Sequence, residues 1–137
     1  MKKAVVSPGA EVLLSGAPLP KSIAAKAAPV GLITNPTGVL PNLRPTFDVL
    51  AELYTLAALF SPEHGVRGDV DAGGDVPDYI DEATGLPVYS TYGPGKGAAF
   101  RRMAELDCVF FDMQDVGARY YTYQYTMRES MEACAAF

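Results

Sequence analysis

Short runs of apolar residues alternate along this chain with stretches in which apolar residues recur every three or four positions. The runs predict buried strands at Val30–Thr34, Leu56–Phe60, Leu86–Ser90 and Cys108–Met113. The spaced positions predict helices at Thr46–Tyr54, at Lys96–Leu106, and from about Tyr120 to the end of the chain. Continuous apolar strands that alternate with helices indicate a parallel sheet covered on both faces. We therefore expect an α/β fold, a three-layer domain with a mainly parallel sheet.

The connecting segments refine this outline. Thr46 is a candidate N-cap for the helix that follows it. Pro87 favours an early or edge position for its strand. Ser15–Pro29 is expected to be a loop around a short helical turn. Val66–Gly85 is a long polar segment, of a kind that is usually functional or mobile in compact domains.

Length and charge restrict the classes of partner. The chain has 137 residues, enough for one domain (1–137) with its own core, and it carries a net charge of −5. This charge argues against nucleic acid or an anionic membrane as a partner. No segment approaches the ~18 apolar residues of a membrane span. The spacing of Cys108 and Cys134 suggests two free buried thiols, and we expect neither a metal nor a cofactor.

The two ends of the chain bear on its cellular location and on its completeness. Met1–Gly9 begins with lysines, as a signal peptide does, but its apolar run stops after three residues. We therefore expect a cytoplasmic protein, or a periplasmic or secreted one if the native start was trimmed. Phe137 lies inside a helical pattern with no cap after it, so we expect the chain to be part of a longer protein.

Polar side chains follow each of the predicted strands. Ligands of open parallel sheets bind beyond the carboxyl ends of the strands. The residues at these ends are Thr34 and Asn35, then Glu63 and His64, then Ser90, Thr91 and Tyr92, and finally Gln114 and Asp115, with Arg119 close behind. Their convergence on one edge predicts a binding site there.

The segment Ser61–Asp69 has the highest density of ionisable groups. Glu63 is the best candidate for a general acid or base, because a carboxyl group that leaves a buried strand is partly desolvated. The alternative is that it caps the next segment or pairs with Arg67. His64 could orient Glu63, bind substrate or act itself, and the alternative is a structural histidine.

Two further acidic features have competing interpretations. Asp115 is a candidate second carboxylate of an acid/base pair, but an Asx-turn leading into Gly117 explains it equally well. Asp69, Asp71 and Asp75 resemble a cation-binding loop. Their spacing does not fit an EF-hand, so solvated surface charge is the better interpretation.

The tract from Arg119 through Tyr125 contains four of the eight tyrosines. Tyrosine combines an apolar face with a polar tip, which suits a wall against which a sugar ring stacks. We expect Tyr121 and Tyr125 to pack in the core. This leaves Tyr120 and Tyr123 as the candidates for substrate contact.

The segment Gly93–Ala98 fits the spacing of a dinucleotide-binding loop, and Asp112 lies on the following strand. That fingerprint normally opens a domain at its first strand, and Pro94 stiffens the turn that would surround pyrophosphate. Nucleotide binding is therefore a minor alternative.

Four motifs together resemble a known family. Val30–Gly38, Ser61–Gly68, Thr84–Ser90 and Phe111–Tyr123, in this order, are similar to the NamZ-type exo-β-N-acetylmuramidases. The resemblance covers most of residues 30 to 127. Departures are small: Met113 stands where Ile is common, and the loop Gly93–Gly97 is richer in glycine than usual.

The resemblance implies a Rossmann-like amino-terminal domain that carries the catalytic centre, with a carboxy-terminal domain of the family that this chain lacks. The implied activity releases terminal β-1,4-linked N-acetylmuramic acid from peptidoglycan fragments, and Glu63 matches the family's proposed catalytic glutamate. Arg67 or Arg119 would bind the lactyl carboxylate. With His64 and Asp115 as the other catalytic candidates, the substrate-binding candidates are Asn35, Arg67, Gln114, Arg119, Tyr120 and Tyr123. The alternative function is a sugar- or cell-wall-binding module without catalysis.

Overall fold

The computed structural model describes residues 6–17, 19, 28–68, 70–71 and 77–136. Five strands form one sheet in the order β3-β4-β2-β1-β5. The strands are β1 (Pro29–Thr34), β2 (Thr55–Ser61), β3 (Tyr79–Ile80), β4 (Pro87–Ser90) and β5 (Cys108–Asp112). β1 pairs in parallel with β2 and β5, and β2 pairs in parallel with β4. The predicted α/β fold with a mainly parallel sheet is confirmed.

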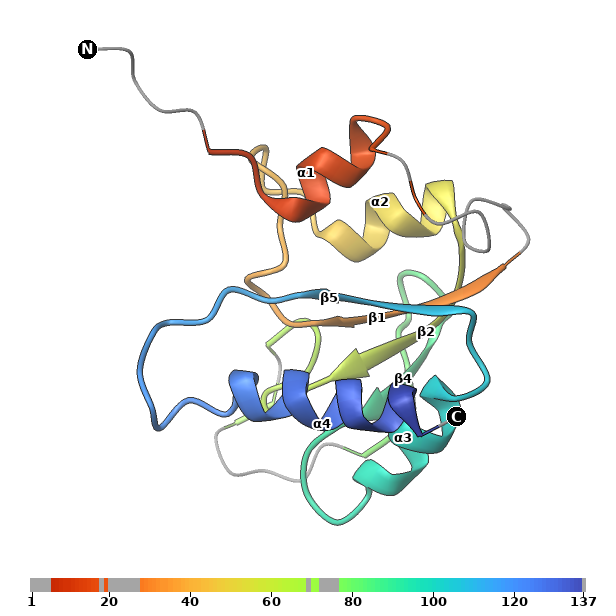
Figure 1. The fold of residues 1–137 in the computed structure, drawn as a ribbon, viewed down its shortest axis with the longest axis vertical. Helices are drawn as coiled ribbons and strands as arrows, with labels where there is room; N and C mark the ends of the chain where they lie inside the picture. The colour runs from red at the N-terminus through yellow and green to blue at the C-terminus, as the bar shows by residue number, and fades with distance from the viewer. Residues whose placement is uncertain (1–5, 18, 20–27, 69, 72–76, 137) are drawn as a thin grey trace.

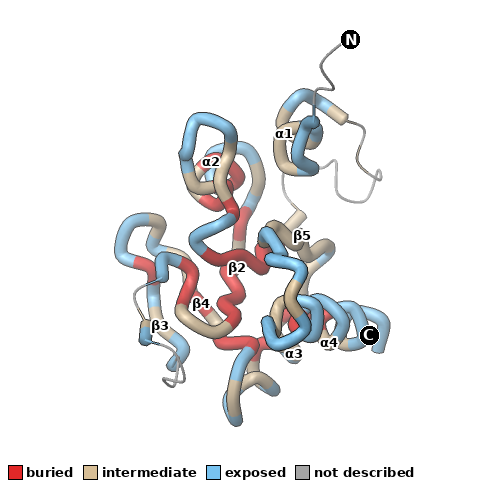
Figure 2. Tube along the Cα trace, turned by 90° about the vertical axis from the view of Figure 1, so that its left-hand side faces the viewer, coloured by how far each residue is buried: buried red, intermediate tan, exposed pale blue. Residues whose placement is uncertain are grey.

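Helices cover both faces of the sheet (Figure 1). α1 (Gly9–Leu14) and α2 (Thr46–Leu53) lie on one face, and α3 (Lys96–Met103) and α4 (Tyr123–Ala135) lie on the other. The layers follow from the alternation of side chains along each strand. In β1, Val30 and Leu32 pack with Leu50 of α2, whereas Ile33 packs with Met103 of α3. Buried residues run through the centre of the molecule along β2 (Figure 2).

Two short elements were not predicted from the sequence. α1 precedes the segment in which we expected a helical turn, and residues 18 and 20–27 of that segment lie outside the described residues. β3 interrupts the predicted polar loop 66–85 and pairs antiparallel with β4. Because β3 covers the outer side of β4, Pro87 lies at the first position of an inner strand.

The predicted N-cap of α2 is wrong. Pro45 is the residue before the helix, and no side chain caps its first turn. Thr46 is instead the first helical residue, and its hydroxyl donates a hydrogen bond to Oδ2 of Asp112 at the end of β5. The hydroxyl therefore joins α2 to the sheet and does not serve its own helix.

Both cysteines are free, as predicted, but they are less buried than expected. Cys108 is half-buried on the edge strand β5, and Cys134 is exposed on α4. The burial that remains raises the pKa of each thiol. In the described part of the chain, no helix is long and apolar enough to cross a membrane.

A close approach at Gly38 generates the first prediction. A Cβ at this position would lie 2.2 Å from Oγ1 of Thr34 and 2.7 Å from the carbonyl oxygen of Asp112. We expect Gly38→Ala to lower the free energy of unfolding by about 1–3 kcal/mol, because sheet backbone must shift to admit the methyl group. Gly97→Ala is the matched control, since its Cβ would meet only Arg101 at 3.5 Å. This helical substitution should raise stability by about 0.5–1 kcal/mol. Urea denaturation of both variants checks the difference, and equal effects would contradict it.

Candidate functional site

The loops that follow the parallel strands are joined to one another at the carboxyl edge of the sheet. The backbone N–H of Gln114, after β5, donates to Oγ1 of Thr37, after β1, at 2.8 Å. The hydroxyl and N–H of Thr91, after β4, both donate to the carbonyl oxygen of Ser61 in β2, at 2.9 and 2.8 Å. Pro36 packs directly on Gly68. The strand exits therefore form one continuous surface.

Glu63 and His64 line a hollow of about 170 Å³ at this edge, and residues 120–123 form the rest of its lining. The structure thus brings together four of the predicted site residues: Glu63, His64, Tyr120 and Tyr123. Tyr121 and Thr122 also line the hollow and were not among the candidates. Their position between two predicted contacts was the only sequence signal for them.

The backbone after β2 turns sharply at His64. His64 has a φ of 79°, and Gly65 has a φ of 82°. A left-handed conformation costs a residue other than glycine about 1–3 kcal/mol and persists only where its surroundings hold it. Pro62 and Val66, on either side of the turn, are fully buried. These two residues anchor the turn and direct Glu63 and His64 to the hollow.

The imidazole of His64 has a fixed orientation. Its Nδ1 lies 3.1 Å from the carbonyl oxygen of Val70, and the N–H of Val70 donates to the carbonyl oxygen of His64 at 3.3 Å. A carbonyl oxygen only accepts hydrogen bonds, so Nδ1 carries the hydrogen. In the neutral ring, Nε2 is then the nitrogen with a free lone pair. The site therefore combines a half-buried carboxyl group with an oriented imidazole.

A relay of hydrogen bonds fixes Asn35 after β1. Oγ1 of Thr37 accepts from Gln114 and donates to Oδ1 of Asn35 at 2.6 Å, and the N–H of Thr37 donates to the same oxygen at 3.0 Å. Asn35 is only 1% exposed, and its Nδ2 has no hydrogen-bond partner among the described residues. An unpaired buried donor costs about 1–3 kcal/mol. Gln114, which is exposed, supplies only its backbone to this relay.

The tyrosines differ from prediction. α4 begins at Tyr123, so Tyr120 and Tyr121 belong to the preceding loop. The expectation that Tyr121 and Tyr125 pack in the core is wrong, because they are 37% and 55% exposed. α4 buries only Thr126 and Ser130, so its aromatic side faces away from the core. The ring centroids of Tyr120 and Tyr121, and of Tyr121 and Tyr123, are 5.5 Å apart, which makes a continuous aromatic cluster.

Asp115 lies in an Asx-turn. Its Oδ1 accepts from the N–H of Gly117 at 2.6 Å, and Gly117 has a φ of 73°. Asp115 lines a second, mostly apolar hollow of about 240 Å³, which shares Tyr123 with the hollow of Glu63. The structure therefore does not place Asp115 in the lining of the Glu63 hollow. Its catalytic role stays a prediction.

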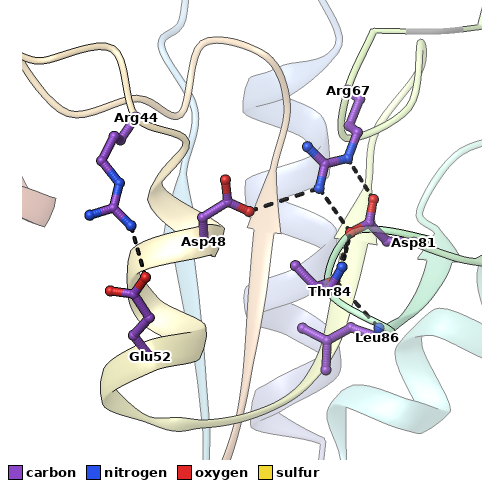
Figure 3. A network of polar contacts seen from close by, with 7 residues as sticks. All are labelled: Arg44, Asp48, Glu52, Arg67, Asp81, Thr84 and Leu86. Carbon is purple, nitrogen blue, oxygen red and sulfur yellow. Dashed lines mark hydrogen bonds and ion pairs between the residues drawn. The ribbon is translucent and has the colours of Figure 1, made fainter.

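Arg67 forms an ion pair with Asp81 (Figure 3). Nε donates to Oδ1 of Asp81 at 2.6 Å, and Nη2 donates to Oδ2 at 2.9 Å. The guanidinium also lies 4.6 Å from the ring centroid of Phe47 and 3.8 Å from Asp48. Arg67 lines a separate hollow with Asp81, so the structure does not bring it to Glu63. A substrate carboxylate would have to compete with Asp81 for this guanidinium.

Arg119 is the other arginine that we expected to bind the lactyl carboxylate of the substrate. It is exposed in the loop directly before Tyr120, and no ion pair joins it to another described residue. Of the predicted acidic loop, Asp71 is exposed, whereas Asp69 and Asp75 lie outside the described residues. Within the described ranges, no group of three or more histidines, cysteines or carboxylates is placed to hold a metal ion.

The ion pair predicts how stability depends on pH. Hydrogen bonds from Arg67, and then from Thr84, lower the pKa of Asp81 to about 2. The pKa of Asp81 is lower in the folded state than in the unfolded state. The stability that Asp81 contributes is therefore complete above about pH 4 and is lost as the pH falls through about 2. We expect Asp81→Asn to lower the free energy of unfolding at pH 7 by about 1–2 kcal/mol, since Arg67 is partly solvent-screened.

Denaturation of Asp81→Asn and the unaltered chain between pH 7 and pH 2 tests this expectation. The difference between their free energies of unfolding should shrink as the pH falls towards 2. Asp48→Asn is the control, because Asp48 lies 3.8 Å from the same guanidinium and its side chain is 37% exposed, whereas that of Asp81 is 3% exposed. A difference that stays constant down to pH 2, or an equally large effect at Asp48, would contradict the assignment.

The fold and sequence have close relatives. The chain is 53% identical over 110 residues to the peptidoglycan beta-N-acetylmuramidase NamZ of Bacillus subtilis (strain 168). The aligned region covers 79% of this chain and 27% of that protein. The chain therefore spans about a quarter of the length of this curated relative.

Two crystal structures of DUF1343 family proteins from Bacteroides fragilis NCTC 9343 share the fold. One superposes with a TM-score of 0.73 at 43% identity and covers 92% of this chain and 30% of its own. The other has a TM-score of 0.67 at 32% identity and covers 93% and 31%. The family model described as exo-beta-N-acetylmuramidase NamZ, N-terminal, matches residues 30–137. Because this match takes in most of the chain, the protein belongs to the NamZ family and corresponds to its amino-terminal domain.

Proposed function

We propose that this domain carries the catalytic carboxyl group of an exo-β-N-acetylmuramidase, which removes terminal N-acetylmuramic acid from peptidoglycan fragments. The observation that carries the proposal is the hollow shared by Glu63, His64 and the tyrosines at the carboxyl edge of the sheet. The similarity to the Bacillus subtilis peptidoglycan beta-N-acetylmuramidase supports the substrate class.

The proposed reaction breaks the bond between C1 of the terminal sugar and the bridging oxygen. Glu63, as a carboxylic acid, donates its proton to that oxygen as it leaves. Water supplies the hydroxyl group that ends on C1, and its remaining proton restores Glu63. His64 accepts or donates a hydrogen bond at Nε2, because Nδ1 is held by Val70. Attack at C1 comes from water, from Asp115 or from the sugar's own acetamide group, which needs no protein nucleophile.

The tyrosine cluster is the proposed wall for the sugar ring. Tyr120 is 83% exposed and belongs to a contiguous cluster with Tyr121 and Tyr123, and contiguous exposed apolar surface often marks a binding site. Its contact with Tyr121 fixes the ring against its neighbour. Arg119, adjacent to this cluster, is the better candidate for binding the lactyl carboxylate, because Arg67 already has Asp81 as its partner.

The role of Glu63 predicts the effect of Glu63→Gln. We expect turnover of a chromogenic β-N-acetylmuramide to fall about 10²–10⁴-fold, because the amide cannot act as the proton donor. Affinity for N-acetylmuramic acid should change little, since size and polarity are kept. Glu82→Gln, at an exposed glutamate that lines a different hollow, is the control and should keep full activity. Unchanged turnover in Glu63→Gln would remove Glu63 from the mechanism.

The role of Arg119 predicts a change in substrate preference. We expect Arg119→Ala to reduce kcat/KM for the muramide about tenfold relative to the matching glucosaminide, which lacks the lactyl carboxylate. Arg67→Ala should affect both substrates alike, because its first loss is the pair with Asp81. If neither variant reduces the preference for the muramide over the glucosaminide, contact of either arginine with the lactyl carboxylate is excluded.

The second candidate function is a sugar-binding module without catalysis. The tyrosine cluster favours it, because aromatic rings can bind a sugar without any catalytic group. Titration calorimetry with N-acetylmuramic acid, beside the turnover assay, separates the two candidates. Binding without any turnover would support the module.

A further inference from the structure

Another hollow lies beside that of Glu63 and is about three times as large. It has a volume of about 530 Å³ and shares Thr122 with the hollow of Glu63. Its lining comes from the exit of β4 (Thr91–Pro94), from Lys96 at the start of α3, and from Tyr125, Thr126 and Glu129 of α4. β4 pairs with β2 in parallel, so the two hollows stand at neighbouring strand exits. A ligand that fills the first can extend across Thr122 into this one.

We propose that this hollow binds the second sugar ring of the substrate, the ring that carries the leaving oxygen. The proposal rests on the proposed function of the Glu63 hollow. It adds a binding site for which Lys96, Tyr125 and Glu129 are the main residues, none of which was a sequence-based candidate for sugar binding.

The ion pair in this hollow presents donors and acceptors side by side. Nζ of Lys96 donates to both carboxylate oxygens of Glu129, at 2.9 and 3.0 Å, and both side chains are partly exposed. Lysine has a third N–H, and each carboxylate oxygen has a second lone pair. A sugar hydroxyl both donates and accepts, so adjacent hydroxyls of one ring can bond to both members of the pair.

Two tyrosines flank the pair from different elements. Tyr92 follows β4, Tyr125 lies on α4, and both remain exposed. Their apolar faces suit the C–H faces of a hexose ring, and their hydroxyl groups can reach its polar rim. A mainly apolar wall with a few placed polar groups is the usual composition of a small-molecule site.

The same contacts argue against a phosphate or a nucleotide at the loop Gly93–Ala98. A phosphate site needs a cation or backbone N–H groups with no competing anion. Lys96 is neutralised by Glu129, and the carboxylate itself would repel a phosphate at this place. A neutral, hydroxyl-rich ring meets no such repulsion.

Calorimetry on the 137-residue chain tests the proposal. Glu63→Gln serves as the background, so that the ligand is not cleaved. The probes are N-acetylmuramic acid, its β-1,4 disaccharide with N-acetylglucosamine, and N-acetylmuramic acid that carries a dipeptide. We expect the disaccharide to bind about tenfold more tightly than the monosaccharide, because the second ring adds its own contacts.

Substitutions in the hollow should abolish the additional affinity for the disaccharide and leave the affinity for the monosaccharide unchanged. The test variants are Tyr125→Ala and Lys96→Ala. Their matched controls both lie on α4: Met131→Ala, at a residue that is 65% exposed, for Tyr125→Ala, and Arg128→Ala, which removes an exposed pair with Glu132, for Lys96→Ala. The control residues do not line the hollow. Exposed pairs contribute little to stability, so these variants should fold.

Each result has a distinct meaning. Loss of the disaccharide gain in the test variants alone supports the second-sugar site. A disaccharide that binds no more tightly than the monosaccharide, or a gain that survives in both test variants, overturns it. Loss confined to the dipeptide ligand also overturns it, because the hollow would then hold peptide. Failure of the monosaccharide itself to bind refutes the proposed function of the Glu63 hollow.

Discussion

Parallel pairing of four strands is the constraint on which the rest of this structure depends. β4, β2, β1 and β5 run in the same direction, so the chain leaves the sheet four times at one edge. The loops there are joined by hydrogen bonds through Thr37 and Thr91, and by the contact of Pro36 with Gly68. Polar groups that are far apart in sequence thereby become neighbours.

The sheet and its exits were predictable, because long apolar runs have few alternatives. The strand at Leu56–Phe60 and the acid that follows it were both located from the sequence, and the structure adds only one residue at each end of the strand. α1 and β3 were not predictable in the same way. They are short, and their apolar positions, such as Leu13 and Tyr79, gain burial only against a core built from distant segments.

The candidate site was predictable by position but not by partner. Nothing near Arg67 in sequence indicates that Asp81, 14 residues later, would accept hydrogen bonds from both Nε and Nη2 of its guanidinium. The prediction that Tyr121 and Tyr125 are buried was wrong for a related reason. Helical spacing identifies which side chains share a face of α4 but not which face meets α3, and here small residues, Thr126 and Ser130, occupy the buried side. Aromatic side chains were therefore left on the surface beside the Glu63 hollow.

The relay through Thr37 connects these observations. It ties the loop after β5, which leads to Arg119 and the tyrosines, to the side chain of Asn35 after β1. Both hydrogen bonds from Thr37 go to Oδ1, so the orientation of the carboxamide is fixed and Nδ2 is left without a described partner. Stability alone would favour a residue without a buried, unpaired donor at this position. A rigid donor that is retained at the edge where Glu63 and His64 also emerge is better explained by the needs of binding than by those of folding.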